Sequence, residues 1–216
     1  MRKLKLLFVV LAVVLCVFSV PVRAELITIA ISGQVTGVSD PSGHFGGQIS
    51  IGDPIAGTYT YDSSAIDTNP DPAIGDYAWY ATPAGISLTI DSFNFRTDPS
   101  NVWSTMEVIN NDWSGTDYYG LRSYHNLFPL SNGTLSDSIL WQLVDSTGTA
   151  LSSDALPLTV PDLSKWSSSS LLIDSSRGGG FLIGAHITSA TLVPEPASVL
   201  LFAGGMLFAR RLSKKN

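Results

Sequence analysis

The sequence predicts an all-β domain, more specifically an antiparallel two-sheet sandwich of the jelly-roll kind. About ten short runs between residues 25 and 192 alternate between apolar and polar side chains and are rich in β-branched and aromatic residues, as half-buried strands are. Clusters of Gly, Pro, Asn, Asp and Ser separate these runs, and no segment there has the length and pattern of an amphipathic helix. No internal repeat of about 20–50 residues is present, which argues against a solenoid or a propeller. We expect a signal helix before this domain and a membrane helix after it.

The predicted strands follow one another at close spacing. Residues 26–38 alternate and contain several β-branched side chains, and residues 55–61 place Tyr59 and Tyr61 on one face. The other expected strands are 48–51, 77–80, 85–90, 93–96, 106–110, 117–124, 138–145, 169–174 and 181–192. Residues 62–76 lack a strand pattern and are expected to form a long loop, and residues 163–166 are expected to form one short helical turn.

The N-terminus predicts export. Residues 1–5 carry three cationic side chains, residues 6–20 are apolar, and the small-x-small triplet that ends at Ala24 is typical of a signal-peptidase site. Residues 1–24 are therefore expected to be a signal peptide, and the mature chain is expected to begin at Glu25. Cys16, the one cysteine, lies in this peptide, so the mature protein would have to be stabilised without disulfides.

The charge of the body differs from that of the whole chain. Residues 25–192 contain four basic and 17 acidic residues, a formal charge of −13, whereas the complete chain has a formal charge of −6. Nucleic acid is excluded as a partner by this distribution, because phosphate binding depends on clustered Lys and Arg.

The C-terminal residues 193–216 have three parts. Val193, Pro194, Glu195 and Pro196 form a stiff, extended segment, because proline fixes φ and disfavours helix at the residue before it. The apolar run 197–209 follows. Its 13 residues would span about 20 Å as a helix, against about 30 Å of hydrocarbon. The chain then ends in a basic stop, comprising Arg210, Arg211, Lys214 and Lys215.

This tail resembles the PEP-CTERM sorting signal of exported bacterial proteins. The segment 52–63, and the segment 152–157 followed by 161–163, resemble stretches found in the bodies of such proteins. The resemblance implies recognition and cleavage by an exosortase, a transient membrane anchor, and a final location at the cell surface or outside the cell. It also implies an association with extracellular polysaccharide or biofilm, and it implies no activity for the body.

A candidate calcium site lies in the loop at residues 62–76. Its oxygen donors are Asp62, Asp67, Asn69, Asp71 and Asp76, and Ca²⁺ binds six to eight oxygen ligands. The loop lacks the residue order of an EF-hand, and Pro70 and Pro72 interrupt it. The alternative interpretation, which we favour, is a loop built from Asx turns without a metal. No other cofactor is expected.

The aromatic residues of the body could stack on sugar rings or fill the core. They include Tyr77, Trp79, Tyr80, Trp103, Trp113, Tyr118, Tyr119 and Tyr124. Trp113 lies in a turn and is the best candidate for an exposed stacking residue, whereas Trp141 is flanked by Ile and Leu and is expected in the core.

No catalytic motif is present. His44, His125 and His186 have no zinc-ligand spacing, and the chain has no G-x-S-x-G elbow. We therefore expect a non-enzymatic surface protein. The first alternative is a carbohydrate- or calcium-binding module. The second is a secreted hydrolase, which would bring His44 or His125 to a serine and a carboxylate.

Overall fold

A computed structural model of the chain describes residues 25–128, 138–175 and 180–194. The expected signal peptide and its cleavage residue Ala24 lie outside the described residues, as do Glu195, Pro196, the apolar run and the basic stop. Within the described ranges there is no helix long and apolar enough to cross a membrane.

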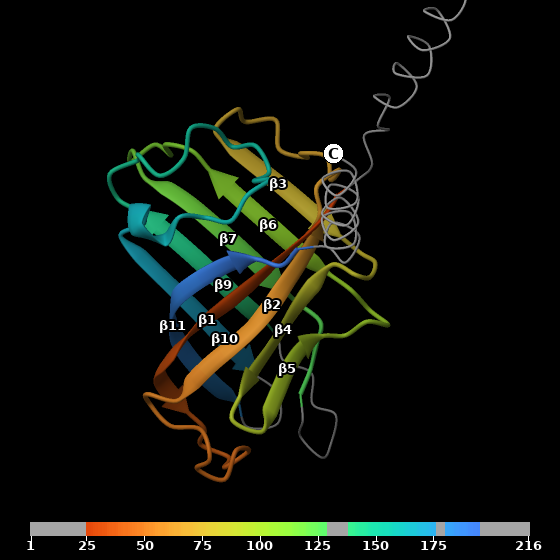
Figure 1. Cartoon of the computed structure of the whole chain (residues 1–216), viewed down its shortest axis with the longest axis vertical. Coiled ribbons are helices and arrows are strands. Elements are labelled where there is room, and N and C mark those ends of the chain that lie inside the picture. The colour runs from red at the N-terminus through yellow and green to blue at the C-terminus, as the bar shows by residue number, and fades with distance from the viewer. Residues whose placement is uncertain (1–24, 129–137, 176–179, 195–216) are drawn as a thin grey trace, which may run out of the picture.

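The described residues form antiparallel strands and one 3₁₀ turn (Figure 1). The strands are β1 (Leu26–Ser39), β2 (Pro54–Asp62), β3 (Ile74–Trp79), β4 (Gly85–Ile90), β5 (Phe93–Thr97), β6 (Ser104–Ile109), β7 (Asp117–Ser123), β8 (Asn126–Leu127), β9 (Ser138–Asp145), β10 (Ser168–Ser175) and β11 (Phe181–Leu192). The turn η1 (Leu163–Lys165) lies where the sequence predicts one, and the Asp162 carboxylate caps it by accepting from the Ser164 amide.

All the strands belong to one continuous sheet of order β3-β6-β7-β9-β10-β11-β1-β2-β4-β5-β8. The all-β antiparallel class is thus confirmed, whereas the jelly-roll sandwich is not: one sheet curls into a half-barrel. Figure 1 shows β2, β4 and β5 lying across from β3, β6 and β7. Strand twist accumulates over so many strands, so the two ends of the sheet face each other around one core.

The core lies inside the curl. We call β2, β4 and β5 one limb of the half-barrel, and β3, β6 and β7 the opposite limb. Tyr59 on β2 and Tyr119 on β7 thus belong to opposite limbs, and their hydroxyl oxygens are 3.0 Å apart in the interior. The ring of Trp141 on β9 lies between them, 5.3 Å from the Tyr59 ring and 5.8 Å from that of Tyr119. Burial raises the pKa of the Tyr59 and Tyr119 hydroxyls, so both stay neutral and hydrogen-bonded.

The half-barrel is joined along one seam. After β7 the chain passes through Tyr124 and His125 into β8, which pairs with β5 at the far end of the strand order. Inside the seam the hydroxyls of Thr97 and Ser123 are 2.8 Å apart, and the Asp98 amide donates to the His125 carbonyl at 2.9 Å. The limb that ends in β5 is therefore held against the limb that contains β7.

Two predicted elements differ from the structure, and one observed strand was not predicted. Residues 48–51 form no strand and lead into a turn between Ser50 and Asp53, because the Ser50 amide donates to Asp53 Oδ2 and the Gly52 amide donates to the Val35 carbonyl. The expected loop at 62–76 ends early, since β3 already begins at Ile74. The two-residue strand β8 was not predicted.

Glycine is required where β2 lies against β4. A Cβ added at Gly57 would lie 2.0 Å from the backbone carbonyl oxygen of Ser87, whereas one added at Gly37 on β1 would meet nothing within 4 Å. We expect Gly57→Ala to lower the free energy of unfolding by about 3 kcal/mol, because the clash is with backbone. Gly37→Ala is the matched control, and urea denaturation of both variants is the measurement. Equal stability of the two variants would contradict this close approach of β2 and β4.

Candidate functional site

A groove of about 330 Å³ crosses the outer face of β3, β6, β7 and β9. We call it the tyrosine groove. Its outward-facing lining includes Asp76, Glu107, Tyr118, Gly120, Arg122 and Tyr124. These side chains share a face because alternate residues of a strand point the same way, while Tyr119 and Leu121 between them are buried.

Tyr118 lies flat against the sheet. A Cβ at Gly120, two residues along β7, would lie 2.3 Å from the Tyr118 hydroxyl and 2.6 Å from its ring carbons. Gly120 therefore provides the space in which the ring rests. The result is an aromatic face held in a fixed orientation at the floor of the groove.

A second aromatic platform stands at the seam end of the groove. The rings of Tyr124 and Trp103 are stacked, with centroids 4.4 Å apart and planes 29° apart. The Arg122 guanidinium carbon lies 5.6 Å from the centroid of the Tyr124 ring, within cation–π range. This contact places the guanidinium beside the aromatic surface.

Two carboxylates line the same groove. Asp76 on β3 and Glu107 on β6 are directly opposite in the strand register. Partial burial, together with the neighbouring Asp76 carboxylate, raises the pKa of Glu107, and Arg122 acts in the opposite direction. The Asn69 amide nitrogen donates to Asp76 Oδ2 at 2.7 Å. The groove thus offers carboxylate acceptors and guanidinium donors beside two flat rings.

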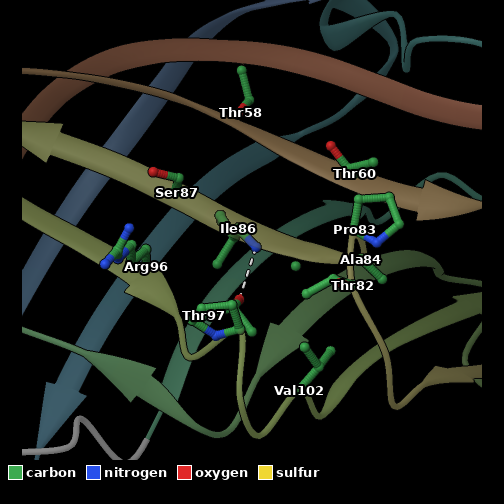
Figure 2. Close-up of a pocket in the computed structure, with 12 residues that line it drawn as sticks. Thr58, Thr60, Thr82, Pro83, Ala84, Ile86, Ser87, Arg96, Thr97 and Val102 are labelled. Atoms are coloured by element: carbon green, nitrogen blue, oxygen red, sulfur yellow. Dashed lines mark hydrogen bonds between the residues drawn. The ribbon is translucent and has the colours of Figure 1, made fainter.

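A second groove of about 260 Å³ lies over β2, β4 and β5 (Figure 2). We call it the Arg96 groove. Arg96 stands at one side of it and Pro83 at the other, with the hydroxyl groups of Thr58, Thr60 and Ser87 along β2 and β4. The Ile86 amide donates to Thr97 Oγ1 at 2.9 Å, which fixes the inner wall.

The side chains of the predicted calcium ligands mainly accept hydrogen bonds from within their own loop. Asp67 Oδ1 accepts from the amides of Asn69 and Asp76, and Asn69 Oδ1 accepts from the amide of Asp71. These contacts bring Asp67, Asn69 and Asp76 together, whereas Asp62 accepts from Ser64. In the part of the chain that the structure describes, no group of three His, Cys, Asp or Glu side chains is placed to hold a metal.

The predicted aromatic residues divide between the two faces. Tyr77, Trp79, Tyr119 and Trp141 are buried, whereas Tyr80, Trp103, Tyr118 and Tyr124 reach the outer surface. Trp113 is 98% exposed in a turn that Asp112 holds by accepting from the amides of Ser114 and Thr116. It lines neither groove.

The histidines do not assemble a catalytic triad among the described residues. Nδ1 of His125 is 3.1 Å from the Asn101 carbonyl oxygen, and Nδ1 of His186 is 2.8 Å from that of Ser169. His44 Nε2 is buried without a hydrogen-bond partner in the described part, and its ring packs against Phe181. No described histidine ring is hydrogen-bonded to a serine hydroxyl or a carboxylate.

The start of the sorting motif follows the last strand directly. Val193 and Pro194 are exposed, and the Val193 amide donates to the Thr28 carbonyl at 2.9 Å. Glu25, the expected first residue of the mature chain, exchanges hydrogen bonds with Ser63 on the neighbouring segment. The two ends of the body therefore lie beside each other on adjacent strands.

Sequence reasoning did not single out Arg96, Glu107 or Arg122. The sequence does indicate that two of them lie on the outer face of the sheet. Glu107 stands between the apolar Met106 and Val108, and Arg122 follows the apolar Leu121, so alternation places both opposite the core. Comparison of the chain with protein-family models, curated proteins and solved structures found no match. The two grooves and the exposed start of the tail are thus the features on which a functional proposal depends.

Proposed function

We propose that the chain is an exported, non-enzymatic surface protein whose β domain binds a neutral glycan. Its C-terminal PEP-CTERM signal is proposed to anchor it in the membrane transiently and to be cut by an exosortase. The protein then acts at the cell surface or in the surrounding polysaccharide. The observation that carries the binding function is the tyrosine groove, and the proposal involves no cofactor and no nucleic acid.

The groove has the chemistry that a sugar needs. The face of Tyr118 suits the apolar C–H surface of a pyranose ring, since aromatic side chains combine a large apolar area with little rotamer freedom. Asp76 and Glu107 accept hydrogen bonds from ring hydroxyls, and Arg122 donates to them. A shallow aromatic site with a few fixed polar groups is a common form of ligand site.

The charge of the domain favours an uncharged ligand. The tyrosine groove holds two carboxylates and one guanidinium, and the body as a whole has a formal charge of −13. A polyanionic glycan would be repelled by this field at low salt. Neutral hexose or pentose polymers avoid that repulsion.

Exposure at the end of β11 supports the sorting half of the proposal. A processing enzyme requires an extended, accessible backbone, and Val193 and Pro194 are exposed and lie beyond the last residue of β11. Body and tail are then separable by one cut beyond the last strand.

The test is binding of the mature exported protein to an array of neutral and acidic polysaccharides. We expect binding to at least one neutral β-glucan, xylan or galactomannan. Tyr118→Ala should weaken it by about tenfold or more, because truncating a central aromatic contact typically removes more than about 1–2 kcal/mol. Tyr80→Ala, which removes a 71% exposed tyrosine outside both grooves, is the matched control.

Gly120→Ala tests whether binding depends on the orientation of the Tyr118 ring and not only on the presence of a tyrosine. Its methyl group would displace the Tyr118 ring, so we expect weaker binding with Tyr118 still present. Absence of binding to every neutral polysaccharide on the array, or equal binding by the Tyr118→Ala and Tyr80→Ala variants, would refute the binding function.

A further inference from the structure

We propose that one corner of the half-barrel is a lipid-facing surface, which rests on the bilayer while the tail is anchored there. We call it the exit corner and define it by Leu26, Tyr80, Leu192 and Val193. Its partner is the headgroup layer of the bilayer. This inference rests on the sorting half of the proposed function, is independent of glycan binding, and specifies which way the anchored domain faces.

Both ends of the body leave the fold at the exit corner. The first residue of β1 and the last residue of β11 belong to it, and these strands are antiparallel neighbours. The Val193 amide continues their pairing by donating to the Thr28 carbonyl at 2.9 Å. Before processing, the apolar runs 6–20 and 197–209 would therefore both enter the membrane beside this corner.

Exposed apolar side chains gather at the same place. In the described part of the chain ten large hydrophobic side chains are exposed, and four of them make up the exit corner. Val193 lies opposite Thr28, so it is the diagonal neighbour of Leu26 on the outer face of the sheet. Leu192, the residue before Val193, is 53% exposed at the rim. The corner is thus a cluster, and its residues are not scattered singly.

An apolar cleft of about 260 Å³ joins Leu26 to Tyr80. Both residues line it, together with Ala78, Trp79, Ala81, Thr82, Pro83 and Ala84. The one charged side chain in its lining is Asp62, whose Oδ1 already accepts from the amide and the hydroxyl of Ser64, each at 2.8 Å. The surface between Leu26 and Tyr80 is therefore mainly apolar.

Tyr80 has the chemistry of a side chain at a membrane interface. It is 71% exposed, and a tyrosine combines an apolar ring with a hydroxyl that stays in contact with water or headgroups. Tyrosine is enriched at the headgroup level for this reason. Leu26 and Val193 beside the cleft add aliphatic surface of the kind that enters the boundary between headgroups and acyl chains.

The short connection to the anchor brings this corner to the lipid. From Pro194 to Ala197, where the apolar run begins, a fully extended chain spans at most about 11 Å. The headgroup layer on each side of the hydrocarbon is about 5–8 Å thick. The run itself is about 10 Å shorter than the hydrocarbon core as a helix, so its insertion pulls the connection towards the bilayer. With the run inserted, the exit corner has no room to stand far from the surface.

The experiment is iodide quenching of a fluorophore on the Tyr80→Cys variant of the exported protein, with its tail uncut, in phosphatidylcholine vesicles. The expected mature chain has no other cysteine, because Cys16 lies in the signal peptide. Neutral lipid is used because anionic lipid would repel a body with a formal charge of −13.

Ile51→Cys is the matched control. Ile51 is also 71% exposed, and it lies in the connection between β1 and β2, at the ends of these strands that are remote from Leu26. We expect the quenching constant at position 80 to be at least about threefold lower than at position 51, because the interface shields the label from iodide. Equal constants in vesicles that retain the protein would overturn the lipid-facing corner and leave the anchor in place.

A second measurement tests the cluster itself. Leu26→Ser and Val193→Ser, introduced together into the labelled Tyr80→Cys protein, should raise the quenching constant at position 80 towards that at position 51. Leu182→Ser is the control, because Leu182 is 45% exposed and pairs with Ser39 at the other end of β1. No change after the double substitution would overturn the inference. Failure of the uncut protein to float with the vesicles would overturn the anchor and this inference together.

Discussion

Trp141→Ala is expected to lower the free energy of unfolding by about 3–5 kcal/mol, as large-to-small changes of buried aromatic residues do. The Trp141 side chain is fully buried and packs against the rings of Tyr59 and Tyr119, which come from opposite limbs of the half-barrel. Its indole nitrogen donates to Ser169 Oγ at 3.2 Å, and the substitution leaves that buried hydroxyl without this donor. For a domain of ordinary stability, about 5–15 kcal/mol, the loss is a large fraction of the total.

Trp113→Ala is the control for this prediction. Trp113 is 98% exposed, so its removal should change stability by less than about 0.5 kcal/mol. Urea denaturation followed by far-ultraviolet circular dichroism measures both variants, since each change also alters tryptophan fluorescence. Similar losses for the two variants would contradict a core built around Trp141.

Asp145→Asn is expected to destabilise the protein strongly at neutral pH and progressively less as the pH falls. The Asp145 carboxylate, at the end of β9, is buried and accepts from the backbone amides of Thr147, Thr149 and Ala150 and from the hydroxyl of Ser167. Asparagine replaces one acceptor oxygen with an NH₂ group that meets these donors, so at least one amide loses its partner.

The pH dependence follows from the hydrogen bonds to the ionised form. Amides of Thr149 and Thr147 chiefly lower the pKa of Asp145 in the folded protein, below its unfolded value of about 3.9. A depressed folded pKa contributes stability that is complete above the unfolded pKa and is lost as the pH falls through the folded pKa. The difference in melting temperature between wild type and Asp145→Asn should therefore be largest above about pH 5 and should shrink towards about pH 2.

Thermal denaturation at a series of pH values measures this difference. Asp174→Asn is the comparison variant, because Asp174 is a partly exposed carboxylate on β10 whose side chain is bonded to Ser138. A difference for Asp145→Asn that stays constant from pH 7 to pH 2 would show that the ionised carboxylate is not what holds the turn.

The strands were predictable because their signals are local. Alternation of β-branched and polar residues located β1, β2, β4, β5, β6, β7, β9, β10 and β11 to within about two residues, the usual limit for element ends. Residues 48–51 alternate as well, but two glycines before them and the Gly52–Asp53 turn after them divert the backbone. The single sheet was not predictable, because β7 pairs with β9 and β11 with β1 across long stretches of chain.

The site was predictable only in part, for a similar reason. Composition drew attention to the aromatic residues and to Asp76, and alternation shows that Tyr118 and Tyr119 point to opposite faces. Which of the two faces is exposed depends on how the sheet curls. That Asp76, Glu107 and Arg122 lie close together depends on the register of β3, β6 and β7. The Arg96 groove lies beside the seam that the unpredicted strand β8 creates.

The most direct measurement of the central claim is a two-dimensional NMR titration of the mature exported protein with the neutral glycan that it binds best on the array. The account predicts shifts in the side-chain signals of Tyr118, Tyr124 and the Trp103 indole, with core signals such as that of Trp141 unchanged. Shifts confined to the Trp113 turn, or no shift with any neutral glycan at saturating concentration, would contradict it.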